Sequence, residues 1–275
     1  MKQIKDQQFS KKTIIIWLIY IVGVLNYVLF NLQKIPQPIF EENSQISLFS
    51  SILIVIAIYL SLSKLLNYKR AFAYLFYWLI IFLLGEKLFL ALGLFSHDEG
   101  ATTFWGDLPL VIGINWLILI FPIYSLATFA ISRFYTKKKS KKLVFTLLLD
   151  GCSIVLFTLL LDPIGQNAGY WSWDNSNAFL LVWGLIPIQI YCFYFIGYIF
   201  ISLPLRWLET YSFDRNDELY YQGFSFPLYL IWSVFIVLSY WAFRKSIDEV
   251  GWFGLMISAL ILVFYFFKRK KIPLQ

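Results

Sequence analysis

Eight long hydrophobic runs decide what this chain can fold into. A helix needs roughly 20 apolar residues to cross the ~30 Å hydrocarbon layer of a bilayer, and each run is close to that length. Because lipid offers no water to backbone N–H and C=O groups, each run is predicted to be a helix. The sequence therefore predicts an all-α, polytopic integral-membrane bundle of about eight transmembrane helices. The runs lie near residues 13–32, 46–66, 70–95, 108–134, 142–161, 178–206, 225–243 and 249–268.

The connections between these runs are too short to hold a separate soluble domain. Residues 1–275 are therefore predicted to form a single transmembrane bundle domain. The composition agrees, because hydrophobic residues make up 60% of the chain and charged residues only 14%, against about 25% charged residues in an average soluble domain.

Basic residues indicate the orientation, since cytoplasmic loops of membrane proteins are enriched in Lys and Arg. If the N-terminus is cytoplasmic, the outer connections hold only Lys34, Arg244 and Lys245. This asymmetry predicts a multi-pass protein of the cell membrane with both termini cytoplasmic. It also assigns the net charge of +7 to contacts with anionic lipid head groups rather than with nucleic acid. The basic segments on the inner side are 2–12, 64–70, 133–142, 206–215 and 268–271.

Several kinds of site are missing from the sequence. The only histidine, His97, lies in a predicted outer loop beside Asp98 and Glu99, and the two cysteines, Cys152 and Cys192, fall inside hydrophobic runs. A haem pocket, a metal site and a Ser-His-Asp relay are therefore not expected. No glycine-rich nucleotide-binding turn follows a strand. We expect no metal and no cofactor, so that carboxylates, tyrosines or water must perform any acid–base chemistry.

Three ionisable residues lie away from the ends of the predicted spans: Glu86, Lys87 and Asp150. A charge at the bilayer centre costs about 2.5–3.5 kcal/mol, so each is a functional candidate. Glu86 and Asp150 are predicted to lie about 13 and 16 Å below the outer ends of their spans. In one interpretation Lys87 forms a structural ion pair with Asp150 while Glu86 faces elsewhere as a proton donor. In the other, all three charges only hold the bundle together.

The connection after the fifth run combines carboxylates with aromatic rings. Asp162 precedes Pro163, which is predicted to end the helix there. Aromatic faces can stabilise a cation, so the connection can serve as a lid over a site that forms carbocations. The alternatives are a helix stop with a solvated carboxylate and aromatic anchors at the bilayer surface. The candidate residues of this connection are Asp162, Tyr170, Trp171, Trp173 and Asp174.

Pro187 is the remaining candidate. It follows apolar residues 178–182 in a run that continues to Leu205, so it is predicted to kink the helix. The carbonyl freed by a kink needs a new partner, which is often found at a cavity.

Three features of the chain together resemble the carotenoid hydratase family. They are Glu86, then Leu108-Pro109 followed by Trp116, and finally Leu161-Asp162-Pro163 followed by Gly169-Tyr170-Trp171-Ser172-Trp173. The family includes bisanhydrobacterioruberin hydratase and bacterial γ-carotene hydratases, and the resemblance is strongest over residues 80–200. It implies a membrane hydro-lyase that adds water to a terminal carbon–carbon double bond of an acyclic carotenoid. It also implies a lipid-soluble isoprenoid substrate and, as further partners, membrane lipids and other membrane enzymes of carotenoid synthesis.

The resulting hypothesis assigns protonation of the alkene to Glu86 or Asp162, and orientation of the attacking water to Asp162 or Asp174. Two alternatives stay open: a non-catalytic membrane protein for lipid binding or assembly, and an isoprenoid enzyme similar to lycopene cyclases. The residues expected to contact the substrate are Tyr170, Trp171, Trp173, Trp116 and Pro187.

Overall fold

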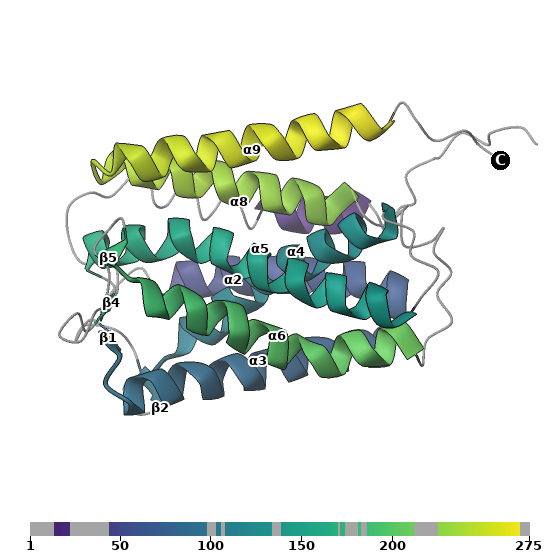
Figure 1. Cartoon of the computed structure of the whole chain (residues 1–275), viewed down its shortest axis with the longest axis horizontal. Coiled ribbons are helices and arrows are strands. Elements are labelled where there is room, and N and C mark those ends of the chain that lie inside the picture. The colour runs from purple at the N-terminus through teal and green to yellow at the C-terminus, as the bar shows by residue number, and fades with distance from the viewer. Residues whose placement is uncertain are drawn as a thin grey trace, which may run out of the picture. The chain divides into compact units, whose positions relative to one another are not determined.

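The computed structural model describes residues 14–22, 44–97, 103–105, 108–133, 139–169, 171–173, 181–182, 186–211 and 225–269. This part of the chain is predominantly helical, as predicted. A helix at residues 14–22 is followed by seven labelled helices (Figure 1). These are α2 (Ser44–Leu66), α3 (Tyr68–Ala91), α4 (Leu110–Arg133), α5 (Lys139–Ala168), α6 (Ile188–Tyr211), α8 (Ser225–Arg244) and α9 (Asp248–Arg269).

Each of these helices overlaps one of the hydrophobic runs. Three of the described helices, α3, α5 and α6, are long and apolar enough to cross a membrane. The number of spans and the side on which the termini lie stay predictions.

Two expected features of the helices are wrong. Pro163 does not end the fifth helix, because α5 continues to Ala168 with Pro163 inside it. A helix tolerates an internal proline where neighbouring groups replace the missing backbone hydrogen bond. Pro187 does not kink a helix either, since it lies in the short strand β6 (Ile186–Pro187) and α6 begins at the next residue.

The chain divides into two compact units, and the single transmembrane bundle expected from the sequence stays a prediction. The first unit comprises Met1–Leu83 and Gly100–Ile118. In it, strand β2 (Thr103–Trp105) pairs with β3 (Leu108–Pro109). Its core contains a row of rings in which Phe82 contacts Trp78 and stacks on Trp116, with ring centroids 5.7 and 4.9 Å apart.

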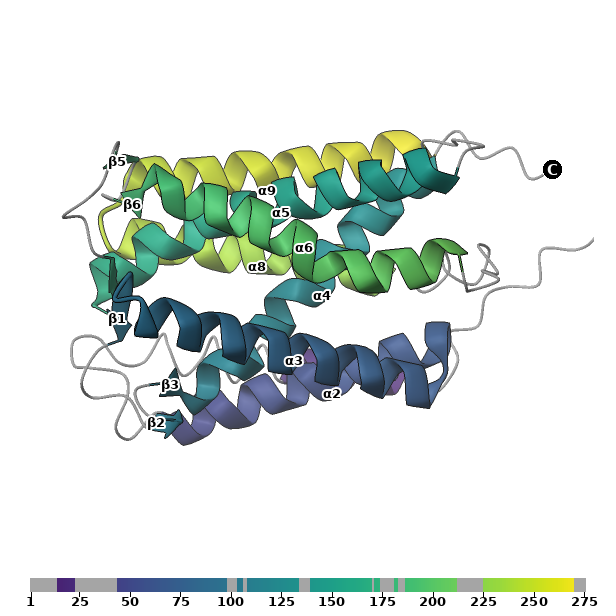
Figure 2. The ribbon, with the colours of Figure 1, turned by 60° about the horizontal axis from the view of Figure 1, so that its bottom comes forward.

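The second unit comprises Leu84–Glu99 and Leu119–Gln275. In this unit α5 packs against α6, α8 packs against α9, and α5 also contacts α8 and α9 (Figure 2). Small residues line the contact between α8 and α9. A β-carbon at Gly254 would overlap the side chain of Ser239, and Ser239 and Ser258 are buried. Small side chains of this kind allow two helix backbones to approach closely.

Two helices of the second unit end in the same way, and their ends meet. Gly93 follows α3 with a φ of 67°, and Gly169 follows α5 with a φ of 77°. Glycine adopts this left-handed conformation without a steric penalty, which is why it often follows a helix. The chain then enters strand β1 (Phe95–His97) after α3 and strand β4 (Trp171–Trp173) after α5. The two strands pair antiparallel, with His97 opposite Trp171.

A second short hairpin lies directly before α6. Strand β5 (Leu181–Val182) pairs antiparallel with β6, so that Leu181 lies opposite Pro187. Ile186 and Pro187 are both buried. The pairing of β1 with β4 and this hairpin place residues from α3, α5 and α6 at one end of the second unit.

Candidate functional site

Carboxyl groups and aromatic rings come together where α3, α5 and α6 meet the strands β1 and β4. All of the residues belong to the second unit. The carboxyl group of Asp162 interacts electrostatically with that of Glu86, and Tyr194 interacts with both. The apolar packing of Trp173 and Tyr191 connects the rings. We call this group the carboxylate–aromatic cluster; its members are Glu86, His97, Asp162, Trp171, Trp173, Tyr191 and Tyr194.

Asp162 is buried, and Glu86 is mostly shielded from solvent, with its Oε2 atom buried. The side chain of Glu86 is 11% exposed, and Asp162 is 2% exposed. They interact electrostatically although 76 positions separate them in the sequence. The continuation of α5 past Pro163 keeps Asp162 inside the helix and directs it into the protein. The solvated helix stop that the sequence left open is therefore wrong for Asp162.

His97 lies beside Glu86. Its Nε2 atom is 3.9 Å from Oε2 of Glu86, and its side chain is 5% exposed. His97 was expected in a polar outer loop, but it belongs to strand β1 and its side chain is shielded from solvent. This distance exceeds that of a hydrogen bond but lies within the range of an ion pair when the histidine is protonated. The position of His97 depends on the pairing of β1 with β4, which joins residues far apart in the chain and has no local signal in the sequence.

Edge-to-face ring contacts hold Tyr194, which interacts electrostatically with both carboxyl groups. The ring of Tyr194 lies edge-on to Trp173 and to Phe89, with centroids 6.3 Å apart in both pairs. Aromatic pairs favour this arrangement because the positive edge of one ring meets the negative face of the other. Phe89 is three residues beyond Glu86 on α3, so the same helix face supplies a carboxyl group and a ring.

Trp171 depends on a glycine for its position. A β-carbon at Gly165 of α5 would overlap the indole ring of Trp171. The side chain of Trp171 therefore packs directly on the backbone of α5, one turn beyond Asp162. The structure thus brings together four residues that the sequence singled out: Glu86, Asp162, Trp171 and Trp173.

The other candidates lie elsewhere or cannot be placed. Tyr170 and Asp174 lie outside the described residues. Pro187 is buried beside Ile186, which belongs to the same apolar core as Trp173. Trp116 belongs to the first unit, where it stacks on Phe82. Its expected contact with substrate stays a prediction.

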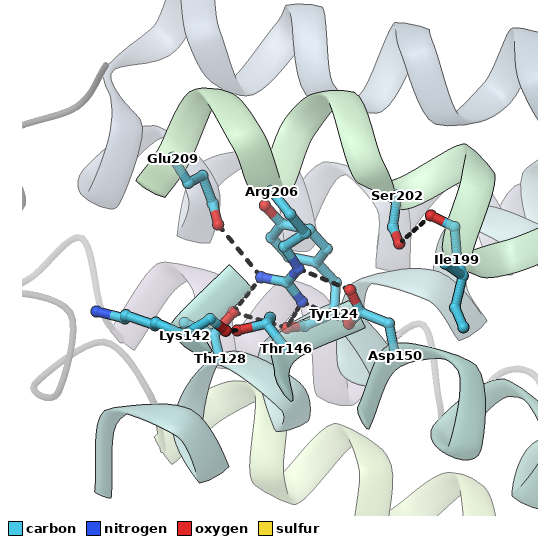
Figure 3. Close-up of polar contacts among 9 residues, drawn as sticks. All are labelled: Tyr124, Thr128, Lys142, Thr146, Asp150, Ile199, Ser202, Arg206 and Glu209. Carbon is cyan, nitrogen blue, oxygen red and sulfur yellow. Dashed lines mark hydrogen bonds and ion pairs between the residues drawn. The ribbon is translucent and has the colours of Figure 1, made fainter. Parts of the chain in front are cut away.

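The predicted ion pair between Lys87 and Asp150 is wrong, because Asp150 is bound by Arg206. The Nε and Nη2 atoms of Arg206 donate to the two carboxylate oxygens of Asp150 at 2.7 and 2.6 Å. Figure 3 shows the guanidinium group lying between Asp150 and Glu209, with Nη1 donating to Glu209 at 3.2 Å. Arg206 is 1% exposed and Asp150 is fully buried.

The remaining donors of Arg206 go to α4. Nη1 donates to the hydroxyl of Thr128 at 2.6 Å, and Nη2 donates to the carbonyl of Tyr124 at 2.8 Å. The guanidinium carbon also lies 3.4 Å from the centroid of the Tyr124 ring. These bonds use all five N–H donors of the side chain. We call Arg206 with these partners the arginine cluster; it joins α4, α5 and α6 and leaves no donor for a ligand.

The arginine cluster was not predicted from the sequence, because the apolar run of the sixth span ends at residue 206 and Arg206 resembles a cytoplasmic basic residue. In the structure α6 continues to Tyr211, which places Arg206 within the helix. The spacing of Arg206 and Glu209 was an available signal, since residues three apart share one face of a helix.

Among the described residues, no three His, Cys, Asp or Glu side chains are grouped so that they could hold a metal ion. Comparisons with protein-family models, with curated proteins and with solved structures gave no match for this chain. The resemblance to carotenoid hydratases stays a prediction.

Proposed function

We propose that this chain is a multi-pass protein of the cell membrane that adds water to an alkene of a lipid-soluble isoprenoid. The faces of α6 support the membrane placement. Its buried face carries Ser202, Arg206 and Glu209, whereas large apolar side chains are exposed. A helix in water has the reverse arrangement. The exposed residues on this helix include Phe193, Ile196, Phe200, Leu203 and Trp207.

Helix α5 has the same distribution, with polar side chains buried and apolar side chains exposed. Asp150, Thr158 and Asp162 are buried, while Val144 and Phe145 are exposed. Large exposed apolar surfaces mark a site of contact with lipid or with a partner, and the length of α5 and α6 favours lipid. We further propose eight membrane spans, one for each hydrophobic run, with both termini in the cytoplasm. The distribution of basic residues supports this orientation.

One observation carries the proposed activity: the carboxyl groups of Glu86 and Asp162, both mostly shielded from solvent, interact electrostatically in a cluster that also contains aromatic rings. Hydration of an alkene needs an acid to protonate carbon and a base to accept a proton from water. It also needs an environment that stabilises the carbocation between these two steps. In the cluster, the two carboxyl groups can act as the acid and the base, and the aromatic rings can stabilise the carbocation.

In the first step Glu86, in its protonated form, donates to the less substituted carbon of a terminal alkene. The O–H bond breaks, a C–H bond forms with the alkene electron pair, and a positive charge develops on the tertiary carbon. The faces of Trp171, Trp173 and Tyr194 stabilise this charge, by about 2 kcal/mol or more in a site shielded from bulk solvent. His97 lies beside Glu86 and is placed to return a proton to it.

In the second step water adds to the cation. A C–O bond forms, and the carboxylate of Asp162 accepts the proton that the water loses. The product is a tertiary alcohol, and no electrons are gained or lost. The proposed substrate is an acyclic carotenoid or a related isoprenoid, because such molecules carry a trisubstituted terminal alkene that gives a tertiary cation.

A pigment assay tests the activity. The full chain is expressed in a bacterial host that accumulates lycopene, and the extracted pigments are separated by polarity and weighed by mass spectrometry. We expect more polar products that are heavier by the mass of one or two water molecules. Glu86→Gln and Asp162→Asn should each remove these products while the protein stays in the membrane.

Glu249→Gln is the matched control, because Glu249 is an exposed glutamate in the first turn of α9. It should leave the product pattern unchanged. Unchanged pigments in a host that carries the wild-type protein in its membrane would overturn the hydratase proposal. They would favour a non-catalytic role in lipid binding or assembly, in which buried charges such as the arginine cluster only hold helices together.

A further inference from the structure

In the carboxylate–aromatic cluster, a carboxyl oxygen of α5 and a hydroxyl of α6 are buried and have no hydrogen-bond partner among the described residues. They are Oδ2 of Asp162 and the hydroxyl of Tyr191. Asp162 is 2% exposed and Tyr191 is 5% exposed. Buried polar groups in proteins are nearly always hydrogen-bonded, to the protein or to an ordered water. Two such groups in one cluster therefore indicate a small polar ligand.

The two groups lie in the same part of the second unit, because Leu159, one turn before Asp162 on α5, packs against the buried core that contains Tyr191. Asp162 interacts electrostatically with Tyr191, yet no direct hydrogen bond joins them. The surroundings are apolar and well packed, since Tyr191 belongs to a buried core with Ile186 and Ile190. Such packing favours a ligand of very few atoms.

The chemistry of the two groups indicates water. A carboxylate oxygen only accepts hydrogen bonds, whereas a tyrosine hydroxyl donates one and can accept another. A molecule that satisfies both groups must donate to Asp162 and accept from Tyr191. Water does both, and a buried site with polar partners is where an ordered water is found.

We propose that Asp162 and Tyr191 together hold one water molecule, and that this is the water that adds to the carbocation. The second part rests on the proposed hydratase function. The hydroxyl of Tyr191 donates to the water oxygen, and one O–H of the water donates to Asp162. The remaining lone pair of the oxygen forms the C–O bond, the proton passes to Asp162, and Tyr191 keeps its own proton.

This assignment separates the two chemical steps. Tyr191 acts on the water and not on the alkene, so its removal leaves protonation by Glu86 in place. A cation without a positioned water returns its proton and reforms the alkene. The Tyr191→Phe variant is therefore expected to catalyse exchange of an alkene hydrogen of the substrate with solvent hydrogen, without forming the alcohol.

Membranes carrying the full chain are incubated with lycopene in deuterated water. For the wild type we expect an alcohol with deuterium on the carbon next to the carbinol carbon. For Tyr191→Phe we expect about tenfold less alcohol, the effect of losing one hydrogen bond to the reacting water, and deuterium in the recovered lycopene. Because the hydroxyl of Tyr191 has no protein partner among the described residues, its removal should not disturb folding.

Tyr198→Phe is the matched control, since Tyr198 is also a buried tyrosine of α6. It should form alcohol like the wild type. If Tyr191→Phe also forms alcohol like the wild type, the role of Tyr191 is overturned. If the wild type neither forms alcohol nor exchanges deuterium, the hydratase proposal fails, and with it the role of this water as nucleophile.

The water itself is tested without any substrate. Radiolysis of membranes by X-rays produces hydroxyl radicals from bound water, and these oxidise the side chains that contact it. We expect oxidation of Tyr191 despite its burial, and loss of that oxidation in Asp162→Leu. Phe235, which is buried to 2% exposure on α8, should stay unmodified. An unmodified Tyr191 in the wild type would overturn the water site.

Discussion

Arg206 of α6 donates two parallel hydrogen bonds to the carboxylate of Asp150 on α5, from Nε at 2.7 Å and from Nη2 at 2.6 Å. This two-pronged geometry is available to arginine but not to lysine, because the guanidinium group is planar with fixed donors. Charge-assisted bonds of this kind are about twice as strong as neutral ones. The pair therefore fixes how α5 and α6 pack against each other.

Replacing Arg206 with methionine should destabilise the protein strongly. The change leaves Asp150 and Glu209 buried without their cation, which typically costs about 3–5 kcal/mol. The free energy of unfolding, measured in detergent by chemical denaturation, should fall by about this amount. Arg244→Met is the matched control, because Arg244 is exposed at the end of α8; it should change stability by less than about 0.5 kcal/mol.

A double variant separates lost attraction from uncompensated charge. Arg206→Met with Asp150→Leu removes both partners, and it should recover part of the lost stability because one isolated buried charge disappears. A single variant Arg206→Met as stable as the wild type would contradict the role assigned to the arginine cluster.

Gly165→Ala should displace Trp171. The added methyl group would overlap the indole ring of Trp171, and the ring or the backbone of α5 must shift. Overpacking of this kind costs about 1–3 kcal/mol, which denaturation in detergent measures. Hydration of lycopene should fall in the same variant because Trp171 leaves its place beside the carboxyl groups.

The control for this change is Gly197→Ala, in which the new methyl group meets no atom within 4 Å. Gly197 lies inside α6, where alanine is favoured over glycine by up to about 1 kcal/mol. This variant should be as stable as the wild type or more stable. If both variants behave alike, the packing of Trp171 on Gly165 is not as described.

The helices could be predicted because each depends on its own stretch of sequence. A long apolar run is a local signal, and helices α2 to α9 overlap the runs from which they were predicted. Pro163 failed as a boundary because a proline removes one hydrogen bond, while the packing of α5 on its neighbours supports the whole helix. Rules drawn from the chain alone cannot weigh that support.

The carboxylate–aromatic cluster was predicted in part for a different reason. Glu86, Asp162 and Trp171 are unusual in their predicted surroundings, and unusual residues can be recognised singly. Their neighbours Tyr191 and His97 could not be recognised, because one belongs to a helix with many aromatic residues and the other to a short polar segment. Only the long-range pairing of β1 with β4 and the packing of α6 on α5 bring them in.

Gly254→Leu should separate α8 from α9. Gly254 faces Ser239 so closely that even a β-carbon would overlap the serine side chain. A leucine forces the helices apart and should lower the free energy of unfolding by about 1–3 kcal/mol. The matched control is Ala259→Leu on the exposed face of α9, which should have little effect. Equal stability of the two variants would contradict the close contact.

The membrane placement of α5 can be tested with cysteine labelling. Cys152 is a free, exposed thiol near the middle of α5, so in solution a charged maleimide should reach it. If α5 crosses the bilayer, this side chain faces lipid, which a charged reagent does not enter. We therefore expect no labelling of Cys152 in native membranes by a charged maleimide, and labelling once the protein is denatured.

Ser140→Cys provides the matched control on the same helix. Ser140 is exposed in the first turn of α5, within the basic segment predicted to be cytoplasmic. With Cys152 and Cys192 replaced by alanine, this cysteine should react with the charged maleimide in inside-out vesicles and not in intact cells. Equal labelling of Cys152 and of the cysteine at position 140 in native vesicles would remove α5 from the bilayer. Labelling of position 140 in intact cells would reverse the orientation inferred from the basic residues.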